Sequence, residues 1–283
     1  GVMYDTGHGV SRDHTRAFEW YSTAANQGMA EAQYVVGDMY MNGSGIVRDE
    51  VLGVEWYGLA ASQGYAEAQL KFGLVHKNGG GGVQRDETRA AKWCIRAAKQ
   101  GLAEAQHNVG NLYMDGYGVA KDKVRAFEWY MKAAKQGYPQ SQLNLANIYF
   151  RGDIKKDEAL AFEWCHKAAS QGVAEAQKNL GSMYRLGKGV SRSYSHAVEW
   201  YIKAADQGVA EAQYNLGNMF KNGQGVSHDE KRAAEWYEKA ADQGYAKAQF
   251  NLKNIYFRQN SPNRSPRSHR SLPPPLGTPS KLF

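Results

Sequence analysis

The sequence predicts an all-α protein: a solenoid of seven helix-hairpin units followed by a disordered C-terminal tail. Two series of residues support this fold class. All seven tryptophans occupy one phase of a repeated pattern, and Gln-Gly pairs close the repeated units. Both series advance by 35 to 37 residues at each step. A fixed period of this length is typical of stacked units that share one continuous core.

The two series can be followed along the printed sequence. The tryptophans are Trp20, Trp56, Trp93, Trp129, Trp164, Trp200 and Trp236, and the paired glycines are Gly28, Gly64, Gly101, Gly137, Gly172, Gly208 and Gly244. We interpret the tryptophans as structural core residues, because one indole can bury about 200 Å² of surface.

The unit at 209–244 contains two helical patterns. Ala212, Leu216 and Met219 share one face of the first helix. Five residues share one face of the second, namely Ala233, Trp236, Tyr237, Ala240 and Ala241. Glycines between the patterns favour a turn with positive φ, and Asp229 is placed to cap the second helix. Each unit is therefore expected to be a hairpin of two helices, each of roughly 13 to 15 residues.

The units follow one another in order. The predicted array covers 1–257, with an incomplete first unit at 1–28, and the remaining units are 29–64, 65–101, 102–137, 138–172, 173–208 and 209–244, with a terminal helix at 245–257. Because Gly1 aligns with the middle of a first helix, we expect the chain to be a fragment of a longer protein.

Local features distinguish individual units. Asp49, Asp86 and Asp122 are predicted N-caps, and Ser193 takes the same role later. Pro139 is predicted to open a first helix, where proline is tolerated. The turn at 78–83 has an extra glycine, whereas the turn at 151–156 is one residue short.

A glycine recurs in the middle of the first helix. It stands at Gly37, Gly73, Gly110, Gly181 and Gly217. Glycine there costs roughly 1 kcal/mol relative to alanine, so we expect close packing above it, under the indole or against the paired alanines.

These motifs together resemble a known family. The pattern A-E-A-Q-x-x-L-G-x-M-Y, then G-x-G-V, then A-x-E-W-Y-x-K-A-A-x-Q-G, resembles the Sel-one-like repeat of the tetratricopeptide-like superfamily. The resemblance covers about nine tenths of the chain. It implies a right-handed α/α superhelix whose first helices line the concave side, and a role as an adaptor or scaffold for other proteins.

The last segment has a different composition. Residues 258–283 contain six of the seven prolines and five basic residues but no acidic residue, so we expect disorder. A near match to an SH3 ligand begins at Arg270, and Ser261, Ser265 and Thr278 each precede proline. The tail could therefore make SH3-type or phospho-dependent contacts, although a solvated tail without partners explains the same composition.

Charge, hydropathy and cysteine content restrict the classes of partner that the chain could bind and the compartment in which it would be found. The net charge is +7, but the tail supplies +5, which leaves no basic stripe on the array for nucleic acid. No apolar run is long enough to span a membrane. Cys94 and Cys165 stand two units apart, too far for a disulfide. The chain is therefore expected to be cytoplasmic, in a reducing compartment.

The sequence contains no recognisable catalytic motif. The serine–lysine, serine–histidine and zinc-binding spacings that we searched for are not present. His76 and His107 lie on first helices of adjacent units and could form a metal pair, but we interpret them as packing or surface residues. We therefore expect no enzyme activity and no cofactor or metal.

Two ladders of asparagines are the candidate binding residues. They share one face of the first helices, because their members are separated by three residues. The first ladder is Asn108, Asn144, Asn179, Asn215 and Asn251, and the second is Asn111, Asn147, Asn218 and Asn254. An amide both donates and accepts hydrogen bonds, so such ladders can hold a peptide backbone. The alternative is that the asparagines tie neighbouring hairpins together.

The sequence thus predicts a non-enzymatic scaffold that binds a protein or peptide on its concave face. The alternative is a regulatory repeat segment of a larger polypeptide, such as a kinase or a cell-wall synthesis activator, whose catalytic part precedes Gly1.

Overall fold

A computed structural model describes residues 1–260 of the chain, with side chains to Phe257. This part is built from fifteen helices in succession. They are α1 (Val2–Thr6), α2 (His14–Asn26), α3 (Ala30–Asn42), α4 (Glu50–Ser62), α5 (Ala66–Asn78), α6 (Glu87–Lys99), α7 (Ala103–Asp115), α8 (Lys123–Lys135), α9 (Pro139–Arg151), α10 (Glu158–Ser170), α11 (Ala174–Leu186), α12 (Tyr194–Asp206), α13 (Ala210–Asn222), α14 (Glu230–Asp242) and α15 (Ala246–Asn260). Residues 258–260, predicted to begin the tail, continue α15, and the rest of the predicted tail, 261–283, lies outside the described residues.

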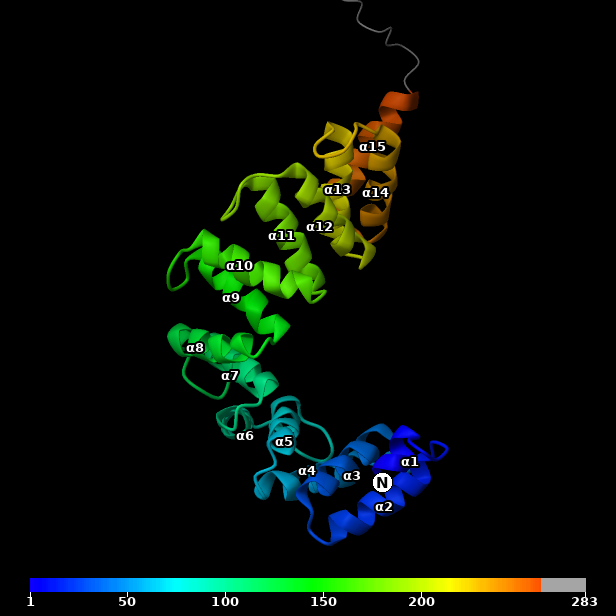
Figure 1. Ribbon diagram of the computed structural model, residues 1–283, viewed down its shortest axis with the longest axis vertical. Coiled ribbons are helices and arrows are strands. Elements are labelled where there is room, and N and C mark those ends of the chain that lie inside the picture. Colours follow the sequence, from blue (N-terminus) through cyan, green and yellow to red (C-terminus); the bar gives the residue numbers. More distant parts are fainter. Residues whose placement is uncertain (261–283) are drawn as a thin grey trace, which may run out of the picture.

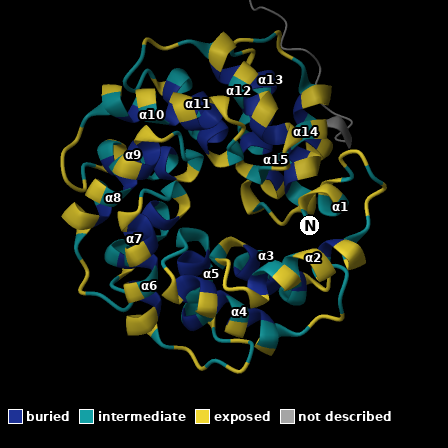
Figure 2. Ribbon diagram, turned by 60° about the horizontal axis from the view of Figure 1, so that its bottom comes forward, coloured by how far each residue is buried: buried dark blue, intermediate teal, exposed yellow. Residues whose placement is uncertain are grey.

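The helices form a single superhelical array. The principal contacts join helices that follow one another in the chain. Seen along one direction, the hairpins surround an open centre, with α3, α5 and α15 on the inner side and α4, α6 and α10 toward the outside (Figure 2). Seen from another side, the chain rises from α1 at one end to α15 at the other (Figure 1). The α-solenoid predicted from the 36-residue period is thus confirmed.

Predicted capping residues define where the second helices begin. The side chains of Asp49, Asp86, Asp122, Asp157 and Asp229 each accept a hydrogen bond from a backbone N–H in the first turn that follows. Ser193 does the same for α12. Proline opens α9, as predicted. These bonds satisfy backbone donors that a helix cannot satisfy internally.

Glycines with positive φ end the helices. Most first helices end at a left-handed glycine, such as Gly223 with φ 64°. The second glycine of the same turn, Gly225, also has positive φ, and a Cβ there would lie 2.4 Å from the carbonyl oxygen of Tyr194. The turn therefore packs directly against the start of α12 in the preceding hairpin. In the turn with the extra glycine, Gly80 and Val83 form an isolated antiparallel bridge.

The core consists of alanines, aliphatic residues of the first helices and, from Tyr57 onward, the residue after each tryptophan. Tyr57, Tyr130, Tyr201 and Tyr237 are at most 3% exposed, and Cys94 and Cys165 take the same place in their hairpins. The prediction that the tryptophans are core residues needs correction. Trp20 is 59% exposed, and the other six are only partly buried, packed against the edges of the clusters.

The mid-helix glycines pack against this buried residue. A Cβ on Gly217 would lie 2.7 Å from the ring of Tyr237, and one on Gly110 would lie 2.5 Å from Tyr130. At Gly73 the obstructing atom is Cys94 Sγ, 2.8 Å away. The glycine therefore makes room for the residue after tryptophan, not for the indole or the alanine pairs as predicted.

A chain of glutamines joins successive hairpins. Gln177, only 5% exposed, donates to the carbonyl oxygen of Ala169 at 3.2 Å and accepts a hydrogen bond from Gln207 at 2.7 Å. Gln207 also donates to the carbonyl oxygen of Gly172 at 3.0 Å. The same glutamine pair recurs within each unit from α3 to α14. The first glutamine of each pair ties its unit to the preceding one by donating to an alanine carbonyl oxygen there.

Candidate functional site

The candidate asparagines lie on the least buried stripe of the first helices. All nine are partly exposed, whereas the residues next to them in sequence are mostly buried. They belong to α7, α9, α11, α13 and α15, whose other faces pack against the second helices. We call this stripe, with the acidic and basic residues beside it, the inner face.

Two members of the second ladder are bonded within their own hairpins. The hydroxyl of Tyr130 donates to Asn111 Oδ1 at 2.7 Å, and that of Tyr237 donates to Asn218 Oδ1 at 2.7 Å. Asp38 accepts the equivalent bond from Tyr57, and Ser182 pairs with Tyr201 at 2.9 Å. These side chains therefore tie the two helices of one hairpin together.

Asn111 also belongs to a longer hydrogen-bonded network. Its amide nitrogen lies 3.1 Å from His107 Nε2, and His107 Nδ1 lies 2.9 Å from the hydroxyl of Ser141, which is fully buried. This arrangement fits a neutral histidine that carries its proton on Nδ1. The imidazole stacks between Tyr130 and Tyr138. Burial lowers the pKa of His107 to about 4.

The first ladder is bonded less completely. Asn108 donates to the backbone of Glu104 at 2.9 Å, Asn144 interacts with the hydroxyl of Tyr130, and Asn251 approaches Asn218 at 3.5 Å. By contrast, the side chains of Asn179 and Asn215 form no hydrogen bond within the described part of the chain. Their amides remain available to another molecule.

The inner face carries charges of both signs along the array. A glutamate recurs at one position of the first helices, at Glu31, Glu67, Glu104, Glu175 and Glu211, and basic residues stand at Lys77, Arg151, Lys178, Arg185 and Lys221. Lys178 is 9% exposed and lies 2.5 Å from Glu175 and 3.1 Å from Glu211. Burial alone lowers the pKa of Lys178, but its hydrogen bonds to the two carboxylates outweigh burial and the pKa is raised. The ammonium therefore stays charged and links α11 to α13.

On the outer side of the array, lysine or arginine side chains lie over the rings of five tryptophans. Lys132 lies 4.1 Å from the ring of Trp129, and Lys239 lies 3.9 Å from Trp236. The same i, i+3 arrangement occurs at Trp93, Trp164 and Trp200. Because each ring already has a cation above it, this series does not form an open aromatic cage.

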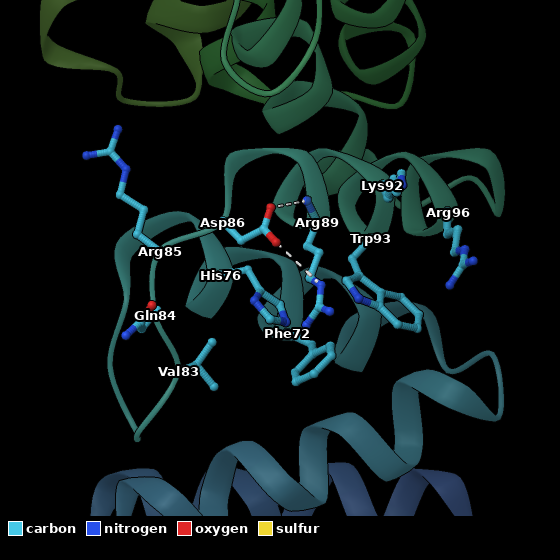
Figure 3. A pocket seen from close by; sticks show the side chains of 10 residues that line it. All are labelled: Phe72, His76, Val83, Gln84, Arg85, Asp86, Arg89, Lys92, Trp93 and Arg96. Carbon is cyan, nitrogen blue, oxygen red and sulfur yellow. Dashed lines mark hydrogen bonds and ion pairs between the residues drawn. The ribbon is translucent and has the colours of Figure 1, made fainter.

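A hollow also lies on the outer side, at α6. It encloses about 820 Å³ and is widely open. In Figure 3, Arg89 lies between His76 and Trp93, while Arg85 and Arg96 point away at opposite ends. Arg89 pairs with Asp86 and Arg85 with Glu87. His76, which lines the hollow, takes the place of the tyrosine found at this position in most other hairpins.

Neither the thiols nor the histidines form a reactive centre. Burial raises the pKa of Cys94 to about 11 and that of Cys165 to about 12, and both cysteines are free. Among residues 1–260, no group of three side chains is placed to hold a metal ion. None of the helices in that range is long and apolar enough to cross a membrane.

The tyrosine–asparagine bonds and the glutamine chain were not foreseen from the sequence. The spacing of residues in the sequence contains a signal for both. Tyrosine recurs nineteen residues after the polar residue that it contacts, and two glutamine series recur at the period of the repeat.

Comparison with known proteins gives the same repeat structure. The family model for the Sel1 repeat matches residues 1–29, 30–65, 66–102, 103–138, 139–173, 174–209 and 210–245. Each match begins one residue after the unit boundary predicted from the Gln-Gly pairs. None of the curated proteins matches the chain.

Two solved structures are similar over most of the chain. One is a protective antigen present in uropathogenic Escherichia coli strains that displays an SLR fold, with 36% identity, 90% of this chain covered and a TM-score of 0.85. The chain spans 55% of the length of that protein. The other is a Sel1 repeat protein from Oxalobacter formigenes, with 36% identity, a TM-score of 0.74, and coverage of 90% of this chain and 73% of the other.

Proposed function

From the premise that this chain belongs to the Sel1 repeat family, we propose that it is a scaffold that binds a protein or peptide on its inner face. Proteins of this family are generally protein-interaction scaffolds. The inner face carries the candidate contacts, and the proposed role involves no catalysis.

One observation carries the proposal. Asn179 and Asn215 occupy equivalent places on consecutive first helices, and their amides have no partner within residues 1–260. An unpaired amide can donate to a peptide carbonyl and accept from a peptide N–H at once. Since the repeat brings such amides to the same face at regular intervals, several weak polar contacts could add along one extended partner.

The rigidity of the array supports this role. The helices carrying the asparagines are fixed by buried tyrosine and glutamine bonds. Such a surface loses little conformational entropy when it binds, which raises the affinity obtained from each contact.

A capture experiment tests the proposal. The full chain and a triple variant, Asn144→Ala, Asn179→Ala and Asn215→Ala, are used as baits in a cell lysate. A matched control removes three exposed side chains from the outer helices of neighbouring hairpins, Glu128→Ala, Glu163→Ala and Glu199→Ala. Melting curves of all three proteins are recorded by circular dichroism.

We expect the inner-face variant to melt like the parent and to lose a partner that the control variant retains. Surface truncations of this kind usually change stability by less than about 0.5 kcal/mol. If both variants capture the same partner as the parent, the inner face is not the binding surface.

A further inference from the structure

A cavity opens on the inner face between α9 and α11. Its volume is about 330 Å³. Ala146 and Cys165 lie at its base, Asn147 and Asn179 on its polar sides, and Phe150 and Arg151 along α9. This size is at the lower end of the range for ligand pockets, which suits a single side chain better than a whole cofactor.

The cavity exists because this hairpin lacks a tyrosine. In four other hairpins the ring of Tyr57, Tyr130, Tyr201 or Tyr237 is buried between the helices. Here Cys165 stands in that position and Ala146 replaces the mid-helix glycine. A thiol and a methyl group fill only the inner part of the volume that a phenol ring occupies elsewhere.

The polar partner of the missing hydroxyl is retained. Asn147 is equivalent to Asn111 and Asn218, each of which accepts a hydrogen bond from a tyrosine. Within the described residues, the Asn147 side chain forms no hydrogen bond. In the other cysteine-containing hairpin, Leu74 takes this place and packs against the cluster that contains Cys94. Only the hairpin at Cys165 therefore combines a missing ring with an unused amide, among residues 1–260.

The side chains at the rim of the cavity favour a negatively charged ligand. Arg151 is exposed and has no carboxylate partner in the part of the chain that the structure describes. Lys178 and Lys188 also line the cavity, although carboxylates pair with both. Gln140 replaces the glutamate present at this point of most first helices. Glu175 of α11 does line the cavity, but Lys178 pairs with it, so the lining carries three basic side chains and one acidic one.

We propose that this cavity is an anchor site for an aromatic side chain of an acidic peptide. The ring enters from the inner face and packs over Ala146 and Cys165, next to the amide of Asn147. A carboxylate beside the aromatic residue meets Arg151. The inference rests on the proposed function, because it assigns the anchor residue of a partner that lies along the inner face.

The uncharged residues at the floor of the cavity favour an aromatic ligand group over a charged one. The thiol of Cys165 is 1% exposed and burial keeps it protonated, so the base is uncharged. A flat ring can cover such a base while its edge contacts the neighbouring amide. A lysine or arginine side chain would bring a cation against Arg151 and Lys188, which like-charge repulsion disfavours.

Peptides of defined sequence test the site on the full chain by isothermal titration calorimetry. The first probe is the capped heptapeptide Gly-Asp-Glu-Tyr-Asp-Glu-Gly, and the second has alanine in place of tyrosine. The matched variant is Ala146→Gly with Cys165→Tyr, which copies the pair found at Gly217 and Tyr237 and fills the cavity with the protein's own ring. A second variant, Arg151→Gln, changes an exposed residue and leaves the core intact.

We expect the tyrosine peptide to bind the parent at least about tenfold more tightly than the alanine peptide, since burying a ring contributes this much. The preference should disappear in the double variant. Arg151→Gln should weaken binding of the acidic tyrosine peptide several-fold and leave a peptide with asparagine and glutamine in place of its acidic residues unaffected.

Three results would each overturn the inference. The first is equal affinity for the two peptides, and the second is no binding at millimolar concentration. The third is a preference for the tyrosine peptide that remains in the double variant. If the double variant does not fold, the comparison of the peptides on the parent and the Arg151→Gln result decide the question. The proposed function fails separately, when the asparagine triple variant retains its captured partner.

Discussion

The tyrosine after each tryptophan sets the distance between the two helices of its hairpin. Its ring lies directly over the mid-helix glycine, and its hydroxyl reaches the polar residue next to that glycine. Where cysteine replaces tyrosine at Cys165, alanine replaces glycine at Ala146. These two substitutions offset each other in volume, as close packing of a core favours, whereas at Cys94 the glycine is retained as Gly73.

This assignment could not be made reliably from the sequence. The sequence pattern places both Trp236 and Tyr237 on the buried face of the helix, but adjacent side chains point about 100° apart, so only one of them can face the centre of the core. The structure places Tyr237 at 0% exposure and Trp236 at the edge. One signal favoured this outcome: a lysine or arginine follows five of the tryptophans at i+3, which indicates a face in contact with solvent.

His107 should make the stability of the array depend on pH. Its pKa is about 4 in the folded chain, against about 6.5 when unfolded. Above pH 6.5 the side chain is neutral in both states and its contribution to stability is complete. As the pH falls from 6.5 to 4, only the unfolded chain takes up the proton, so stability decreases by about 2 kcal/mol.

Melting curves at pH 7, 6, 5 and 4 measure this effect. The control is His107→Tyr, because Tyr34 and Tyr214 occupy the same position and stack on tyrosines in the same way. The parent should lose more stability than the variant across this range. Parallel curves for the two proteins would show that His107 is not the responsible group.

At the scale of the element, the hairpins are joined by buried glutamines as well as by apolar contacts. Helix lengths, caps and turns followed from the periodic pattern, because they depend on residues close together in sequence. The buried glutamine bonds that cross a junction run from a first helix to an alanine carbonyl oxygen at the end of the preceding hairpin. Such a bond depends on how one unit packs on the next, and the pattern of a single unit does not determine that packing.

Removal of one glutamine should therefore loosen the junction between two hairpins. Gln177→Ala takes away one donor and one acceptor. The carbonyl oxygen of Ala169 then keeps only the N–H of Gly172, and Gln207 loses its side-chain acceptor. We expect a loss of about 2–3 kcal/mol in the free energy of unfolding, measured by urea denaturation. Gln140→Ala, at an exposed position of α9, is the control and should be nearly neutral. Equal effects of the two substitutions would contradict the role of the buried pair.

At the scale of the whole molecule, stability is local. The principal contacts join consecutive helices, so each hairpin depends mainly on its neighbours. The candidate asparagines illustrate what this architecture hides from sequence reasoning. Their common face was predicted from spacing alone, but the bonds that occupy Asn111 and leave Asn179 free depend on residues in other helices.

A core substitution near the C-terminal end should open only that end. Tyr237 is fully buried, so Tyr237→Ala should cost about 3–5 kcal/mol. Hydrogen exchange measured by mass spectrometry should increase in α13, α14 and α15 and remain unchanged from α3 to α8. Phe250→Ala, which removes a ring that is 66% exposed, is the control. A uniform increase along the chain would show that the array unfolds as one unit.

The position of the tryptophans has a consequence for spectroscopy. Six of the seven indoles occupy equivalent, partly covered places, one in each hairpin, and five of them have a cation above the ring. They should emit fluorescence in one narrow band. When a single hairpin opens, one indole enters water while the others stay covered, so the intensity at the red edge of the emission should rise in steps that count the opened hairpins.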